Sequence, residues 1–249
     1  MSPHMSPRIV AATVRRVLAQ LRRDHRTMAL LIVVPCVLMT LLRLVYDGAP
    51  QVFDRIGAPL LGIFPFVTMF LVTSIATLRE RTSGTLERLL TMPMAKLDLL
   101  LGYGLAFAAV AVVQVLVASA LTLGPLGLTV RGSAWLVVVL AVADALLGTA
   151  LGLFVSAFAA TEFQAVQFLP AVVLPQLLLC GLFVPRGQMQ AALRWVSDVL
   201  PLSYAVDGMT RVTTSGAVSA GLVIDLLVIL AAAFAGLVGG AATLRRRTA

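Results

Sequence analysis

The run SAWLVVVLAVADALLGTALGLFVSAF, residues Ser133–Phe158, contains a single charged residue, Asp144. A helix needs about 20 predominantly apolar residues to cross the roughly 30 Å hydrocarbon core of a bilayer. The run therefore predicts a membrane-spanning helix. A carboxyl group inside such a helix is costly. Asp144 is either protonated or hydrogen-bonded inside a helix bundle, or it serves as a proton relay or a partner for a cation.

Five further segments are comparably long and apolar. The chain has 249 residues, of which 60% are hydrophobic and 12% are charged, and its mean hydropathy is +1.01. A soluble domain carries roughly 25% charged residues. The sequence therefore predicts an all-α polytopic membrane protein with six transmembrane helices. The predicted spans are Met28–Tyr46, Ile56–Leu78, Leu97–Leu123, Ser133–Phe158, Phe163–Val184 and Leu222–Leu244.

The N-terminal segment, residues 1–27, is basic and amphipathic. Ser6 and Pro7 are typical of a helix start, with a capping hydroxyl followed by proline at the first helical position. Apolar residues then recur at three- and four-residue steps from Val10 to Leu21, and six arginines, the last of them Arg26, project to the opposite side. This pattern predicts a helix that lies in the membrane surface and does not span it.

Lysine and arginine are distributed unevenly between the predicted spans. Thirteen of the nineteen lie in the N-terminal segment, in the connection 79–96 or in the C-terminal tail. By the positive-inside rule these three regions, and so both termini, are cytoplasmic, which agrees with an even number of spans. Orientation and anionic lipid headgroups also explain the net charge of +8 without a nucleic-acid partner.

The connection between the fifth and sixth spans, residues 185–221, is too apolar for a free loop. It contains Met189, Leu193 and Val196 together with two amphipathic rings, Trp195 and Tyr204. We expect short re-entrant helices that dip back into the outer leaflet and are shielded by the bundle. The two rings are expected at the membrane interface.

No residue pattern in the sequence indicates catalysis or metal binding. A GxxxxGK[ST] phosphate loop, a GxSxG elbow and an HExxH pair are all missing. Cys36 and Cys180 lie inside apolar spans without a CxxC or Cys/His neighbour, so we interpret both as buried and inert. We therefore expect a chain that is not an enzyme and has no cofactor of its own.

One dense polar segment, RERTSGTLERLLTMP at residues 79–93, separates the second and third spans. Its TSG sequence, residues 82–84, is typical of one helix ending and the next being capped by a hydroxyl. Three leucines then share one face of a short helix that Pro93 ends. A helix this short does not persist alone, because helix nucleation is costly. It must be held by the membrane surface, by neighbouring segments or by a docked protein.

Two groups of side chains are candidates for a substrate pathway. One group lies on the second span, and the other lies on the fifth span, where phenylalanines flank two glutamines. Such groups usually pack against neighbouring helices, and the functional alternative is a cavity for an apolar substrate with a few polar handles. The candidates are Phe64, Phe66, Met69, Phe70, Phe163, Gln164, Gln167 and Phe168.

The polar segment resembles the loop after the second span in type-2 ABC exporter permeases, the group that includes daunorubicin-resistance-like drug exporters. In that family the loop has the form E-x-x-x-G-T-x-E-x-L and ends in a proline. The matching positions are Glu80, Gly84, Thr85, Glu87, Leu89 and Pro93. The outer run PLSYAVD at residues 201–207, followed by Arg211, resembles the family's second signature before the last span.

The resemblance implies that the polar segment is a coupling helix, within a coupling loop at 79–96, seated in a groove of a separate cytoplasmic ATPase subunit that binds ATP and Mg. It also implies that residues 1–27 form a connecting helix, that 28–249 form one six-span domain, and that 185–221 cap the exit. A second permease, identical or related, completes the transporter in a bacterial-type inner membrane. The residues expected at the ATPase are Glu80, Arg81, Gly84, Thr85, Leu86, Glu87, Leu89 and Leu90.

The leading interpretation is therefore the permease subunit of an ATP-driven exporter for a hydrophobic drug-like, lipid or glycan substrate. Two alternatives stay open. An ion-coupled secondary transporter would work through Asp144, which the family pattern does not account for, although no inverted repeat relates the two sets of three spans. A non-transporting anchor would only hold a soluble partner at the membrane.

Overall fold

The computed structural model describes residues 6–83, 96–215 and 219–243, and within these ranges the regular structure is entirely helical. Six of the helices are long and apolar enough to cross a membrane, namely α2, α3, α5, α6, α7 and α10. This confirms the prediction of an all-α fold with six spans. The elements are α1 Pro7–Arg23, α2 His25–Val45, α3 Pro50–Thr82, α5 Lys96–Leu123, α6 Ala134–Val155, α7 Glu162–Leu179, η1 Arg186–Gln188, α8 Ala191–Val199, α9 Pro201–Ser215 and α10 Ala220–Thr243.

Local capping chemistry places several helix ends away from the predicted boundaries. α3 begins at Pro50 and not at Ile56, because proline suits the first helical position. α7 ends at Leu179, well before the predicted end at residue 184. Gly181 follows with a φ of +94°, a backbone conformation that favours glycine and ends a helix. α6 likewise ends at Val155, before the predicted end at residue 158.

α3 is longer than the apolar layer it crosses. Its 33 residues correspond to about 50 Å at 1.5 Å per residue, whereas the hydrocarbon core is roughly 30 Å thick. Pro59 and Pro65 lie inside the helix without ending it. At least one end of α3 must therefore project beyond the hydrocarbon, and its last turns carry Arg79 and Glu80.

The N-terminal basic helix ends earlier than predicted, at Arg23, and Asp24 follows it. Asp24 Oδ1 accepts a hydrogen bond from the Thr27 backbone N–H at 3.1 Å, so Asp24 caps the start of α2. Arg26 consequently belongs to α2 and not to the amphipathic helix. The predicted side-chain cap at Ser6 is absent. The Ser6 backbone N–H donates to the carboxylate of Asp98, with both N–O distances at 3.3 Å.

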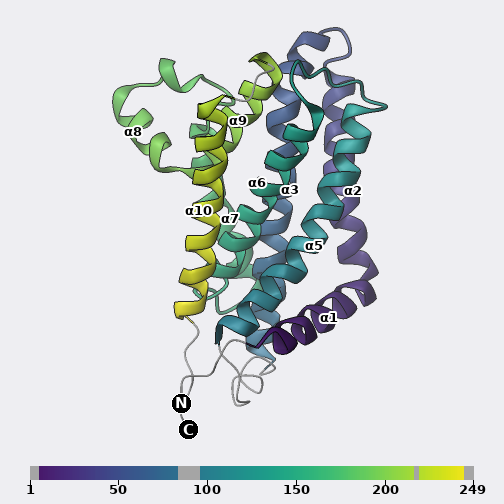
Figure 1. Cartoon of the computed structure of the whole chain (residues 1–249), viewed down its shortest axis with the longest axis vertical. Coiled ribbons are helices and arrows are strands. Elements are labelled where there is room, and N and C mark those ends of the chain that lie inside the picture. The colour runs from purple at the N-terminus through teal and green to yellow at the C-terminus, as the bar shows by residue number, and fades with distance from the viewer. Residues whose placement is uncertain (1–5, 84–95, 216–218, 244–249) are drawn as a thin grey trace.

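α1 crosses the lower end of the bundle and packs against α5 (Figure 1). The buried residues of α1 are Thr13, Val17 and Leu21. A β-carbon at Gly102 of α5 would lie 2.5 Å from the β-carbon of Thr13, so the contact requires glycine at that position. Part of the predicted apolar stripe is thus used in packing against the protein itself, and the placement of α1 in a membrane surface stays a prediction.

α6 is the central helix of the bundle and lies between α3 and α10 (Figure 1). Gly148 and Gly152 of α6 face the backbone of α3. A β-carbon at these glycines would overlap the carbonyl oxygens of Phe66 and Phe70, respectively. Small residues four positions apart let two helix backbones approach closely in a membrane, where packing and not water exclusion drives association.

The two ends of the bundle differ in what they carry. The described start of α1, the end of α3, the start of α5 and the end of α10 all lie at the lower end in Figure 1. This end, formed by α1, the last turns of α3 and the start of α5, is called the loop end. The opposite end, with η1, α8 and α9, is called the cap end. Three short helices therefore occupy the segment predicted to hold them.

Replacement of Gly148 or Gly152 by alanine tests the contact between α6 and α3. A glycine that is merely tolerated in a helix gives way to alanine with a gain of about 1 kcal/mol. Overpacking of a tight site costs typically about 1–3 kcal/mol. We therefore expect both variants to unfold in detergent at a lower temperature than the original protein, as followed by fluorescence-detected size exclusion after heating.

The matched control is Gly104→Ala in the first half of α5. A β-carbon there would lie at an ordinary distance of 3.5 Å from its nearest neighbour, in Leu237. This variant is expected to be as stable as the original protein or more stable. Higher thermal stability of Gly148→Ala would contradict the close contact.

Candidate functional site

An ion pair between a half-buried arginine and a buried glutamate joins three helices at the loop end. Glu80, near the end of α3, is 6% exposed. Arg16 of α1 donates two hydrogen bonds to its carboxylate, with N–O distances of 3.2 and 3.1 Å. Arg16 also donates to the hydroxyl oxygen of Tyr103 in α5. Bidentate arginine–carboxylate pairs fix orientation as well as distance, so this pair holds α1, α3 and α5 together.

A second ion pair joins the end of α3 to the start of α7. Arg79 donates to both carboxylate oxygens of Glu162, at 2.6 and 2.9 Å. Both side chains are about half exposed, and exposed pairs contribute little free energy, roughly 0–1 kcal/mol. Glu162 lies in the first turn of α7, where an acid is favourable. The start of α7 is capped by the hydroxyl oxygen of Thr161, which accepts a hydrogen bond from the Gln164 backbone N–H.

Two of the eight predicted coupling residues, Glu80 and Arg81, lie in the described part of the chain. The other six, from Gly84 to Leu90, lie outside it. The carboxylate of Glu80 points into the protein and is occupied by Arg16, so it is not presented at the surface. The buried Nε and Nη2 atoms of Arg81 have no hydrogen-bond partner among the described residues.

The eight predicted pathway residues lie on α3 and α7 and differ widely in burial. Phe66, Met69 and Phe70 are completely buried in the core on α3. Phe163 at the start of α7 is 72% exposed. The amide oxygen of Gln164 accepts from the Ala160 backbone N–H at 2.8 Å and so helps to fix the start of the helix. The remaining three, Phe64, Gln167 and Phe168, are exposed or half-buried. Their part in a substrate pathway stays a prediction.

Asp144 lies fully buried where α6, α3 and α9 meet. Its side chain is 0% exposed, and neither carboxyl oxygen has a hydrogen-bond partner in the described ranges. A β-carbon at Gly62 of α3 would lie 3.2 Å from Asp144 Oδ2 and equally far from Met209 Cε. Asp144 thus faces the interior of this chain. Of the alternatives left open for it, a hydrogen-bonded acid has no partner among these residues, and its role stays a prediction.

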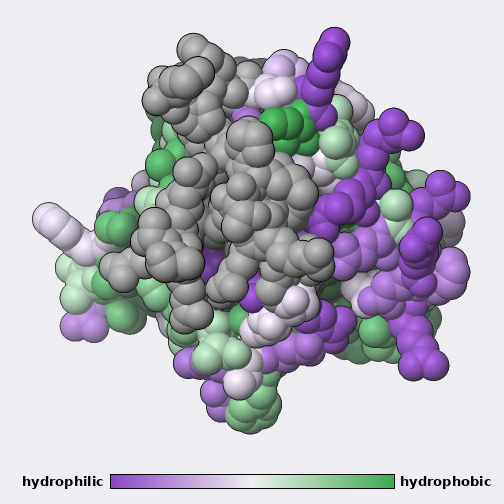
Figure 2. All heavy atoms as spheres, turned by 90° about the horizontal axis from the view of Figure 1, so that it is seen from below, coloured by the Kyte–Doolittle hydropathy of each residue, from purple (hydrophilic) through white to green (hydrophobic). Residues whose placement is uncertain are grey.

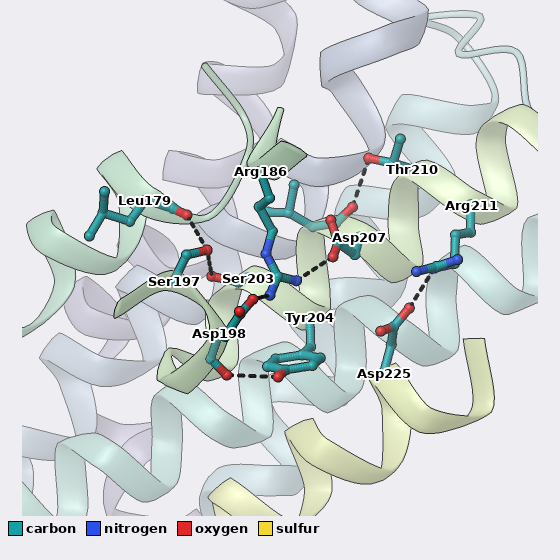
Figure 3. A network of polar contacts seen from close by, with 11 residues as sticks. Leu179, Arg186, Ser197, Asp198, Ser203, Tyr204, Asp207, Thr210, Arg211 and Asp225 are labelled. Atoms are coloured by element: carbon teal, nitrogen blue, oxygen red, sulfur yellow. Dashed lines mark hydrogen bonds and ion pairs between the residues drawn. The ribbon is translucent and has the colours of Figure 1, made fainter. Parts of the chain in front are cut away.

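Arg186 is the centre of a polar network at the cap end (Figure 3). It follows α7 and forms ion pairs with Asp198 of α8 and Asp207 of α9. Its guanidinium carbon lies 5.1 Å from the ring centroid of Tyr204, a cation–π arrangement. The Tyr204 hydroxyl donates in turn to the Asp198 carbonyl at 2.7 Å. One arginine thus ties the chain after α7 to both short helices.

Two further contacts complete the cap end. The Ser197 hydroxyl donates to the Leu179 carbonyl at 2.7 Å and shares a hydrogen bond with the Ser203 hydroxyl at 3.0 Å (Figure 3). Arg211 of α9 donates to Asp225 of α10 at 3.0 Å. Together they attach α8 to the end of α7, and α9 to the last span.

The cap network gives structural roles to residues of the outer signature and adds residues that sequence analysis had not singled out. Tyr204, Asp207 and Arg211 all lie on α9 and all take part. Arg186 and Asp198 had no expected role. No spacing rule links residue 186 to 198 and 207, since the partners meet only after three elements have folded together. Trp195, 79% exposed on α8, makes none of these contacts.

Comparison with known proteins agrees with this architecture. The family model described as "ABC-2 type transporter" matches residues 8–213. ABC transporter G family member 20 of Dictyostelium discoideum is 25% identical over 69% of this chain and 24% of its own length. The probable multidrug ABC transporter permease YbhS of Escherichia coli is 28% identical over 66% of this chain and 44% of its own length. A second probable multidrug permease of Escherichia coli, YbhR, is 26% identical over 59% and 40%.

The chain spans less than half the length of these curated relatives. The family match, however, extends from α1 through α9 and includes both the ion pair at the loop end and the network at the cap end. The six apolar helices of the chain, five of which lie within the matched residues, agree with a multi-pass membrane subunit. The chain therefore belongs to the ABC-2 type transporter family.

Proposed function

We propose that this ABC transporter membrane subunit exports a hydrophobic drug-like, lipid or glycan substrate and is driven by a separate ATPase that docks on residues 79–93. ATP and Mg bind to that partner. The names of the Escherichia coli relatives, probable multidrug permeases, support a drug-like substrate class. The positive-inside rule supports a cytoplasmic loop end and cytoplasmic termini.

The observation that carries this proposal is the ion pair between Arg16 and the buried Glu80. Glu80 lies four residues before Gly84, where the predicted docking segment continues. Its carboxylate connects the end of α3 to α1 and, through Arg16, to Tyr103 of α5. A force applied by an ATPase at this segment is thus passed to three helices at once. Arg79 extends the connection to α7 through Glu162.

A second permease is the expected partner within the membrane. Large apolar side chains are exposed on α2, α7 and α10, including Leu44, Leu178 and Phe234. On a six-span subunit these faces contact either lipid or another subunit, because water does not reach them. A pair of permeases with two ATPases, in a bacterial-type cytoplasmic membrane, is the assembly that we propose.

Charge changes at Arg16 and Glu80 test the coupling. Removing Arg16 leaves the carboxylate of Glu80 without its partner in a largely buried position, whereas Arg16 itself is 34% exposed and keeps part of its hydration. We expect Glu80→Arg to abolish most ATP-dependent export by the reconstituted transporter while leaving membrane insertion intact. Arg16→Glu should behave in the same way, and the double swap Arg16→Glu with Glu80→Arg should recover a large part of the activity.

Asp47→Asn serves as the control for this experiment. Asp47 is an exposed partner of Arg43 outside the loop end, so its loss is expected to leave export unchanged. Unaltered export and unaltered ATPase stimulation in both single swaps would count against coupling through Glu80. ATPase that copurifies without any substrate-dependent turnover would favour the non-transporting anchor.

The carboxyl group of Asp144, which has no hydrogen-bond partner among the described residues, favours one competing function, ion-coupled transport. Under the ATP-driven proposal this group is a neutral packing element, and Asp144→Asn keeps nearly the same shape. We therefore expect Asp144→Asn to retain ATP-driven export. An ion-coupled transporter predicts the opposite, namely transport that follows a proton gradient without ATPase and that is lost in Asp144→Asn. Vesicle transport with either energy source distinguishes the two.

A further inference from the structure

A crevice of about 400 Å³ lies at the loop end between α1, α2, α3 and α5. This volume is within the range of about 300–1,000 Å³ that is usual for small-molecule sites. Leu30 of α2 lines one edge and is 62% exposed, so the crevice is open to the surroundings of the bundle. Leu31 and Phe107 are both buried and line its inner side.

The part of the crevice farther from α1 is apolar. Its walls are formed by Val34, Leu71, Val72 and Ile75, with Thr68 as the polar residue among them. The Thr68 hydroxyl is already engaged, because it donates to the Phe64 carbonyl at 3.0 Å and accepts from Gln114 Nε2 at 2.6 Å. A molecule bound in this region would make apolar contacts and few hydrogen bonds.

The part of the crevice next to α1, called the mouth below, is lined by polar residues as well as by the apolar Val17 and Leu21. Asp24 and Glu80 line it, but both acids are engaged, Asp24 with Thr27 and Glu80 with Arg16. The side-chain hydrogen bond from Thr27 is the main cause that holds the pKa of Asp24 below its ordinary value. Both carboxylates at the mouth therefore already have hydrogen-bond partners within the protein.

Two arginines beside the mouth have no such partner. Arg23 follows the lining residue Gln20 by three positions in α1, and Arg26 precedes the lining residue Leu30 by four positions in α2, so each lies about one helical turn from the crevice. Both are exposed, and neither forms an ion pair with any residue in the described ranges. Figure 2 shows hydrophilic residues gathered over part of this end of the molecule.

We propose that the crevice binds an anionic phospholipid, with an acyl chain between α2 and α3 and the phosphate beside Arg23 and Arg26. The proposal rests on the proposed orientation, which places the loop end in the cytoplasmic leaflet. Apolar walls at the depth of a membrane span fit an acyl chain. Exposed arginines that form no ion pair with any described residue attract anionic headgroups. A bound lipid would lie against α3 beside Glu80, and so would brace the pair that the ATPase is proposed to act on.

Lipid binding to the purified permease in detergent, measured by native mass spectrometry, tests the site. The probes are phosphatidylglycerol and phosphatidylcholine with the same acyl chains. We expect phosphatidylglycerol to bind more tightly, and Arg23→Gln with Arg26→Gln to reduce this preference by roughly 30-fold, since each basic residue near an anionic surface contributes about fivefold. Arg8→Gln with Arg15→Gln, which removes equal charge elsewhere on α1, is the control.

Filling the crevice tests the place of the acyl chain. Val34→Trp is expected to remove one bound phosphatidylglycerol per chain. Val33→Trp, on the neighbouring exposed side of α2, is expected to retain it. Equal lipid binding by the two tryptophan variants would overturn the crevice site. If Val34→Trp does not fold, the variant Arg23→Gln with Arg26→Gln still tests the site. An unchanged preference of that variant for phosphatidylglycerol overturns the proposal by itself.

The lipid measurement needs no ATPase and no transport. A failure of the charge-swap experiment at Glu80 therefore leaves the lipid result standing. Conversely, if the lipid preference is absent while the Glu80 variants lose export, only the lipid site is refuted. Displacement of the lipid by a drug-like compound in the original protein but not in the variants would identify the crevice as a substrate site, and would contradict a resident lipid.

Discussion

The close approach of α3 and α6 at Gly148 and Gly152 is the constraint on which the rest of the structure depends. Within a bilayer there is little hydrophobic gain in bringing helices together, so association relies on close packing. With the middle of α3 held against the backbone of α6, the ends of α3 have little freedom in position. The helix is about 50 Å long by its 33 residues. Its last turns therefore carry Arg79 and Glu80 to a defined place at the loop end.

The two ends of the bundle use polar contacts for different purposes. At the loop end, Arg16–Glu80 and Arg79–Glu162 connect α3 to its neighbours α1, α5 and α7 beside the segment where a partner is proposed to dock. At the cap end, Arg186 holds the short helices to the end of α7, and Arg211 holds α9 to α10. A polar contact in these places costs less desolvation than one in mid-membrane, because water is near. Asp144, buried and unpaired within the described chain, is the exception.

The spans could be predicted from composition alone, because a run of about twenty apolar residues matches the thickness of the hydrocarbon core. The short outer helices could be predicted from the apolar character of residues 185–221. Helix ends were less predictable, since they depend on single caps such as Asp24 and on the turn at Gly181. The contact of Arg16 with Glu80 joins residues 64 positions apart and leaves no trace in local spacing. The stripe of Phe66, Met69 and Phe70 was ambiguous for another reason: packing and cavity lining require the same residues, and within this chain the structure uses these three for packing.

The most direct test of the account is whether α1 and the end of α3 move as one body. Nitroxide labels on the exposed positions Ala19 and Thr82 report on that pair, and labels on Thr82 and Val199 report on the two ends of the bundle, after both native cysteines are replaced by serine. Pulsed EPR on the assembled transporter should show an unchanged 19–82 distance between nucleotide-free and ATP-bound states, together with a shift in the 82–199 distance. A change in the 19–82 distance on ATP binding would contradict rigid coupling through Arg16 and Glu80.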